Sequence, residues 1–180
     1  DPFSLNDLKK SHGIMMNGLM ENAGTFRTGS VGVINERGKV IHIAPPHGMV
    51  NGLMEQLFDW LKSSKTQMLI RSSVFHYEFE FIHPFGDGNG RTGRLWQTAL
   101  LASWKPVFEW IPIESIIKDN QEEYYRSIGL STSEGKSDRF ILFMLGVIRQ
   151  AVEELARDAR NHQSHISSQI GALLRVMETY

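Results

Sequence analysis

One short segment of this 180-residue chain concentrates residues that can do chemistry. The thirteen residues Ile82–Arg94 contain one histidine, one aspartate, four glycines, an asparagine and two arginines. Glycine accepts positive φ angles, so the run Gly88-Asn89-Gly90 can turn successive backbone N–H groups toward one point and form a nest for an anion. A helix that begins here would add the positive end of its dipole. The segment therefore predicts a phosphate site.

The charged residues of this segment refine the prediction. Arg91 and Arg94 are three positions apart, so on a helix they share a face, and helical side chains lean toward the N-terminus, which brings both guanidiniums back to the nest. An anion alone would repel Asp87, but a carboxylate is a good ligand for Mg²⁺ that bridges two phosphates. We therefore expect a magnesium-bound polyphosphate.

His83 precedes Asp87 by four residues and is placed to meet the same phosphates. An imidazole accepts a proton near neutral pH, so His83 is the candidate general base for an incoming hydroxyl. Pro84 is expected to end a helix and Phe85 to anchor the loop in the core. The alternative is a Gly-rich surface turn with solvated charges. Any one of these residues alone would fit that alternative better, but the complete run in this order argues against it. A P-loop is excluded because no Gly-Lys-Ser/Thr follows a strand.

The elements that must position this segment are mostly helices. Apolar residues recur at helical spacing in several runs, which predict helices up to about Glu21, over Met49–Leu61, Met68–Phe81, Leu95–Trp104, Ile113–Ile128 and Phe140–Ala159. The β-prone runs Val31–Ile34 and Val40–Ile43 flank a polar turn and predict a hairpin, which Pro45-Pro46 ends. The predicted fold class is mainly α with one β-hairpin.

The composition sets limits on partners and compartment. A net charge of -1 and a pI near 6.7 give no global attraction to nucleic acid or to an anionic membrane. Cysteine is absent, and no apolar run approaches the ~20 residues of a membrane-spanning helix. We expect no membrane association and a cytoplasmic location, and the missing initiator Met suggests a fragment of a longer chain. The helical residues His76, Glu78 and Glu80 are expected to be hydrogen-bonded or solvated.

The segment from His83 to Arg94 resembles the signature of the Fic family, His-x-Phe-x-Asp/Glu-Gly-Asn-Gly-Arg-x-x-Arg, at every fixed position. The similarity also takes in the Gly24–Arg27 turn, the hairpin and the Tyr124-Tyr125 pair. It implies a Fic-type helical bundle, with the hairpin as a flap beside the active site. Residues 1–160 would form the catalytic domain, and 161–180 a linker and the start of a truncated C-terminal helical element.

The resemblance implies a protein AMP transferase that uses ATP and Mg²⁺, with His83 as general base and Asp87 as metal ligand. The residues implied to hold the nucleotide are Gly88, Asn89, Gly90, Arg91, Arg94 and, around the adenine, Tyr125. Ser131-Thr132 stands where many relatives have an asparagine, which weakens the case for recognition of the adenine edge.

The resemblance also suggests partners and alternatives. A target protein would dock as an added strand on the hairpin, Val31–Ile43. Transfer of another phosphate-containing group, removal of AMP by water, and a nucleotide-sensing module whose missing C-terminal region binds DNA stay open. Relatives block the second arginine with a glutamate from a Ser/Thr-x-x-x-Glu-Gly/Asn helix, which this sequence lacks. We therefore expect Arg94 to be free, and the inhibitor to lie upstream of Asp1 or on a separate protein.

Overall fold

The computed structural model describes residues 1–34, 38, 40–161, 171 and 175–176. Their elements follow the chain in the order α1 (Leu5–Met15), β1 (Gly32–Ile34), β2 (Val40–Ile43), η1 (His47–Met49), α2 (Val50–Ser63), α3 (Met68–Ile82), α4 (Asn89–Trp104), η2 (Pro106–Trp110), α5 (Ile113–Asp119), α6 (Gln121–Glu134) and α7 (Asp138–Asn161). The expected fold class, mainly α with one hairpin, is confirmed.

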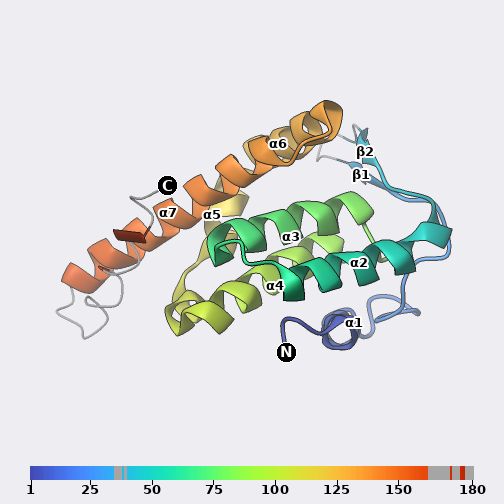
Figure 1. Ribbon diagram of the computed structural model, residues 1–180, viewed down its shortest axis with the longest axis horizontal. Helices are drawn as coiled ribbons and strands as arrows, with labels where there is room; N and C mark the ends of the chain where they lie inside the picture. Colours follow the sequence, from blue (N-terminus) through green and yellow to red (C-terminus); the bar gives the residue numbers. More distant parts are fainter. Residues whose placement is uncertain (35–37, 39, 162–170, 172–174, 177–180) are drawn as a thin grey trace.

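Helix α3 is the centre of the bundle. It packs against α4, α2 and α7, so apolar side chains are needed on most of its faces (Figure 1). Phe75 and Phe79 are fully buried there, and Leu100 and Phe140 meet the same core from α4 and α7. Helix α1 contacts α4 and α2. The loop between α3 and α4, which carries the motif, is thereby held at one end of two tightly packed helices.

The hairpin lies over the C-terminal end of α3. Strands β1 and β2 are antiparallel, with Gly32 opposite Ile43 and Val33 opposite His42. The ring of His42 stacks on Phe81 at 4.4 Å, and its Nε2 donates a hydrogen bond of 2.7 Å to the carbonyl of Phe81. Strand β2 also contacts α6. The hairpin is therefore attached next to the motif loop.

Three helix boundaries differ from the sequence predictions. Helix α1 ends at Met15, not near Glu21, because its C-cap Met16 leaves the helical conformation and the chain reaches a left-handed glycine, Gly18, two residues later. Helix α4 begins at Asn89, ahead of its apolar stripe. The run predicted as one helix over Ile113–Ile128 is interrupted at Asn120, whose N–H turns back to two carbonyls of α5.

The C-terminal element expected over 161–180 lies mostly outside the described residues, so the proposed division into two parts stays a prediction. Within the described part of the chain, none of the helices combines the length and apolar character needed to cross a membrane.

Candidate active site

The motif loop leaves α3 through a strained residue. His83 caps the helix in the left-handed conformation, at φ 49° and ψ 61°, and its N–H donates to the carbonyl of Phe79 at 2.9 Å. In the described chain it is the one residue other than glycine with positive φ. Such a conformation costs about 1 kcal/mol or more and persists where surrounding contacts enforce it. The next residue is Pro84, which cannot continue a helix.

Side chains then fix the loop from within. Asn89 is buried, and its amide both accepts from the N–H of Phe85 at 2.9 Å and donates to the carbonyl of Phe85 at 2.8 Å. Phe85 itself is fully buried, as expected of an anchor, and stacks on the ring of His12 at 3.6 Å. The buried side chain of Asn89 therefore serves to hold the loop.

His12 supports the loop from α1. Its Nδ1 accepts the N–H of Gly24 at 2.9 Å, so its Nε2 carries the proton that is donated to the carbonyl of Asp87 at 2.9 Å. These two hydrogen bonds define a neutral ring. Burial lowers the pKa of His12, in agreement with that assignment.

The segment predicted to form the nest lies where α4 begins. Gly88 caps the helix with φ 79°, and its N–H donates to Asp87 Oδ1 at 2.6 Å. A Cβ on Gly88 would come within 2.7 Å of Met16 Sδ, so only glycine fits. The first N–H groups of a helix have no carbonyl one turn earlier to bond, and the helix dipole adds positive potential. This end of α4 can therefore bind an anion.

The charged residues of the motif surround this end. Arg91 lies 3.7 Å from Asp87 Oδ2, and the Asp87 side chain is 70% exposed. Arg94 reaches over Gly90, where its guanidinium would be 3.1 Å from an added Cβ. The expectation that Arg94 is free is wrong, because its Nε donates to Glu114 Oε1 of α5 at 3.0 Å.

Two pockets flank α6. A pocket of about 130 Å³ is lined by Arg94, Glu114, Ile117, Lys118, Gln121, Tyr124 and Tyr125. A wider one of about 430 Å³ is lined by Tyr77, Glu78, Phe81, Thr132, Gly135, Lys136, Ser137 and Asp138. Tyr125 thus shares a pocket with Arg94. Thr132 lines the other pocket together with Phe81, whose ring stacks on His42 of the hairpin.

The environment of His83 keeps its ring neutral. Its side chain is 17% exposed, and burial lowers its pKa to about 4, with the charges of Arg27 and His42 acting in the same direction. Its Nδ1 lies near both the carbonyl and the carboxylate of Glu80 but makes a well-formed hydrogen bond with neither. At pH 7 the ring can therefore accept a proton, as a general base must.

Arg27 is an important residue that the sequence reasoning assigned only to a turn. Its buried guanidinium donates to the carbonyls of His83 at 2.8 Å, Pro45 at 2.6 Å, Gly29 at 2.8 Å and Ile82 at 3.2 Å. It therefore joins both ends of the hairpin segment to the strained end of α3. The partners are distant in sequence, and the signal available was a lone arginine in a Gly-rich turn.

Glu80 was expected to be hydrogen-bonded or solvated, and at least one of its carboxyl oxygens is neither. Its side chain is buried, and no hydrogen bond to its Oε1 is found in the described structure. His76 does follow the expectation, because Gln97 and Tyr124 satisfy both ring nitrogens. The available signal for Glu80 was its position between two phenylalanines, one helical turn before His83.

Comparison with known proteins agrees with the geometry. The model of the Fic/DOC family matches residues 2–101, more than half of the chain. The chain therefore belongs to the Fic/DOC family. A Fic family protein from Desulfovibrio desulfuricans superposes with a TM-score of 0.84 at 45% identity, over 88% of this chain and 49% of that chain.

Two curated relatives carry the name of an activity. Protein adenylyltransferase fic-1 of Caenorhabditis elegans is 27% identical over 179 residues, which are 96% of this chain and 30% of the relative. Protein adenylyltransferase Fic of Drosophila willistoni is 35% identical over 108 residues, 57% of this chain and 20% of the relative. The chain thus spans less than a third of either relative.

Proposed function

We propose that this domain is a protein adenylyltransferase, which moves AMP from ATP to a hydroxyl group of a protein. The observation that carries the proposal is the neutral, shielded ring of His83 beside the anion site at the start of α4. The names of the curated relatives support the same reaction class. An intact base argues against a module that only senses nucleotide, because binding alone does not need one.

The residues divide the reaction between them. His83 takes the proton of the target hydroxyl, and the hydroxyl oxygen forms a bond to the α-phosphorus while the bond to the bridging oxygen of the β-phosphate breaks. Pyrophosphate leaves with its charge opposed by Arg91, Arg94 and the first amides of α4. Because the Nδ1 atom of His83 faces Glu80, Nε2 is the nitrogen that receives the proton.

The residues present fit a magnesium ion. Asp87 offers one exposed carboxylate at the mouth of the nest. Within the described residues there is no group of three or more histidine, cysteine or acidic side chains that would form a ready-made metal cage. Mg²⁺ commonly binds through one or two carboxylates and completes its shell with water and substrate phosphates. When bound to Asp87, it would help to neutralise the phosphates.

The nucleotide must extend beyond the small pocket between Arg94 and Tyr125. Ligand pockets usually measure about 300–1,000 Å³, and this one holds about 130 Å³. The target would dock on the hairpin, where Val40 and Ile43 of β2 expose their side chains and can meet an added strand.

Intact-mass measurement after incubation with Mg-ATP and a supplied target tests the proposal. We expect a gain equal to AMP on the domain or the target, and its loss without Mg²⁺. His83→Ala should cost ~10²–10⁴ in rate while ATP affinity stays within a few-fold, because the nest binds the phosphates. A gain equal to phosphate would indicate a kinase-like reaction, and loss of AMP from a pre-modified target would indicate the reverse activity.

A further inference from the structure

Glu80 and His83 bring two buried polar atoms together without a hydrogen bond. Glu80 lies one helical turn before His83 and is 3% exposed, and its Oε2 is 3.7 Å from His83 Nδ1. In the described structure, neither Glu80 Oε1 nor His83 Nδ1 has a hydrogen-bond partner. Buried polar groups without partners are costly and rare. A movement of about 1 Å would bring the two side chains within hydrogen-bond distance.

The packing of α4 holds Glu80 in this place. A Cβ on Gly93 would lie 2.9 Å from Glu80 Oε1, and one on Gly90 would lie 3.9 Å from the same atom. Gly93 therefore leaves room for the carboxylate beneath the phosphate-binding helix. A core position that served packing alone would be filled by an apolar side chain.

Charged and titratable groups face this pair from several neighbouring elements. They are His76 on α3, Arg94 on α4, Tyr124 on α6, His42 on β2 and Arg27 before β1, with Asp87 further along the loop. Burial raises the pKa of Glu80 to about 7, against the opposing effect of Arg94. Near neutral pH this carboxyl can therefore change its charge, while His83 stays neutral.

The backbone carbonyl of Glu80 near Nδ1 only accepts and favours a proton on Nδ1 at any pH, so the Glu80 side chain changes the tautomer of the neutral ring only where its protonated carboxyl donates to Nδ1 in place of that contact. A carboxylate only accepts, so it favours a proton on Nδ1 and leaves the lone pair of Nε2 free. A protonated carboxyl can donate to Nδ1, and the ring proton must then sit on Nε2. Only the first arrangement can take a proton from a hydroxyl at Nε2, and holding the wrong tautomer can cost ~10⁴ in rate in other enzymes.

We propose that Glu80 is a positioning residue that selects the tautomer of His83, so that the site is competent when Glu80 is ionised and incompetent when it is protonated. The catalytic part of this inference rests on the proposed transfer reaction. After the hydroxyl proton reaches Nε2, the Nδ1–H of the imidazolium donates a hydrogen bond to the Glu80 carboxylate. This hydrogen bond stabilises the new positive charge until the proton on Nε2 passes to solvent.

Nitrogen-15 shifts of the histidine rings in the free protein test the tautomer directly, whether or not transfer occurs. Between pH 8 and pH 5.5 the proton of His83 should move from Nδ1 to Nε2, with a midpoint near 7. The Glu80→Gln variant should show no such switch, because an amide does not titrate. Glu78→Gln on the same helix is the matched control and should keep the switch. A tautomer of His83 that does not change with pH in the wild-type protein overturns the proposal, and this outcome needs no variant.

Kinetics supply the second arm. Where the wild type transfers AMP, kcat should rise with pH around 7, and Glu80→Gln should lower kcat by roughly 10–100-fold and remove that rise, with KM for ATP within about twofold. Transfer by the variant at the wild-type rate and pH profile would refute the role of Glu80. A tautomer switch in a protein that transfers nothing would refute the proposed function and leave the tautomer selection standing.

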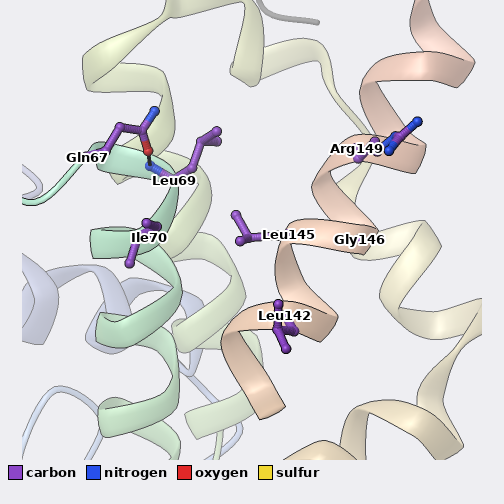
Figure 2. Close-up of a pocket in the computed structure, with 7 residues that line it drawn as sticks. All are labelled: Gln67, Leu69, Ile70, Leu142, Leu145, Gly146 and Arg149. Carbon is purple, nitrogen blue, oxygen red and sulfur yellow. Dashed lines mark hydrogen bonds between the residues drawn. The ribbon is translucent and has the colours of Figure 1, made fainter. Parts of the chain in front are cut away.

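A second candidate, a groove on another face, supports no proposal. The groove between the start of α3 and α7 (Figure 2) holds about 210 Å³ and is lined by Gln67, Leu69, Ile70, Leu142, Leu145, Gly146 and Arg149. Its walls are mostly apolar, and nothing in the structure identifies what covers it.

Discussion

Arg94 is the residue whose partners matter most for nucleotide affinity. In the structure its Nε donates a hydrogen bond to the carboxylate of Glu114, whose side chain is 69% exposed. An incoming phosphate would have to compete with this carboxylate for the same guanidinium. A partly exposed ion pair contributes about 1 kcal/mol or less, so the competition is modest and depends on salt.

Removing the competing charge should strengthen ATP binding. We expect Glu114→Gln to lower the Kd of ATP about 2–5-fold at low ionic strength, and the gain to shrink as salt is added. Calorimetry of Mg-ATP binding measures it. Glu123→Gln is the matched control, because Glu123 pairs with Arg126 on the surface of α6. Unchanged or weaker binding in the Glu114 variant would show that Arg94 does not hold a phosphate.

At the scale of elements, Arg27 connects the hairpin to the end of α3. One guanidinium donates to four carbonyls, from the segments on both sides of the hairpin and from the strained residue His83. Burial lowers the pKa of Arg27, yet an arginine stays charged at any ordinary pH, so these hydrogen bonds are charge-assisted. A single ammonium group lacks the planar fork that serves several acceptors at once.

Arg27→Lys should therefore destabilise the domain although the substitution keeps the positive charge. Loss of two or more buried hydrogen bonds should cost roughly 3 kcal/mol, read as a lower urea midpoint. Transfer should also fall, because the left-handed conformation of His83 loses support. Arg126→Lys, on an exposed helix surface, should stay within about 0.5 kcal/mol of wild type. Equal effects of the two substitutions would mean that the four hydrogen bonds do not secure the hairpin.

Across the whole molecule, buried histidines link folding to protons. In the described structure, burial lowers the pKa of His76 and His83 to about 4, and it also lowers the pKa of His12 and His42. The unfolded chain binds protons on these rings from about pH 6.5 downward. Burial raises the pKa of Glu80 to about 7, and that of Glu78, which opposes the trend.

Acid should therefore weaken the fold before the carboxylates of the surface titrate. The histidine contribution is fully present above about pH 6.5 and is lost as the pH falls toward 4. With four such histidines against two such glutamates, unfolding takes up protons in this window, and each net proton lowers stability by ~1.4 kcal/mol per pH unit. Urea midpoints between pH 7 and 4.5 should fall, and the slope should be shallower in His76→Gln. A flat profile would contradict the assigned burial of these rings.

The sequence by itself determined the features that depend on neighbours in the chain. Helical spacing of apolar residues identified most of the helices, and β-prone runs around a polar turn identified the hairpin, because each pattern reports its own local period. The motif of His83 to Arg94 was sufficient to predict an anion site, since glycine conformations and a helix N-terminus are local properties. Local patterns marked helix ends less well, as at Met15 and Asn120, where the outcome depends on capping contacts.

Only the tertiary structure decided which side chains meet across the chain. The guanidinium of Arg27 and the carbonyl of His83, to which it donates, lie 56 positions apart in sequence, and Arg94 and Glu114 lie 20 apart. The burial of Glu80 follows from the close approach of α4 at Gly93, which no spacing within α3 reveals. Burial can shift the pKa of a carboxyl or an imidazole by several units. Which side chains are buried is set by which faces of the helices pack together. The proton chemistry of this site was therefore fixed by packing.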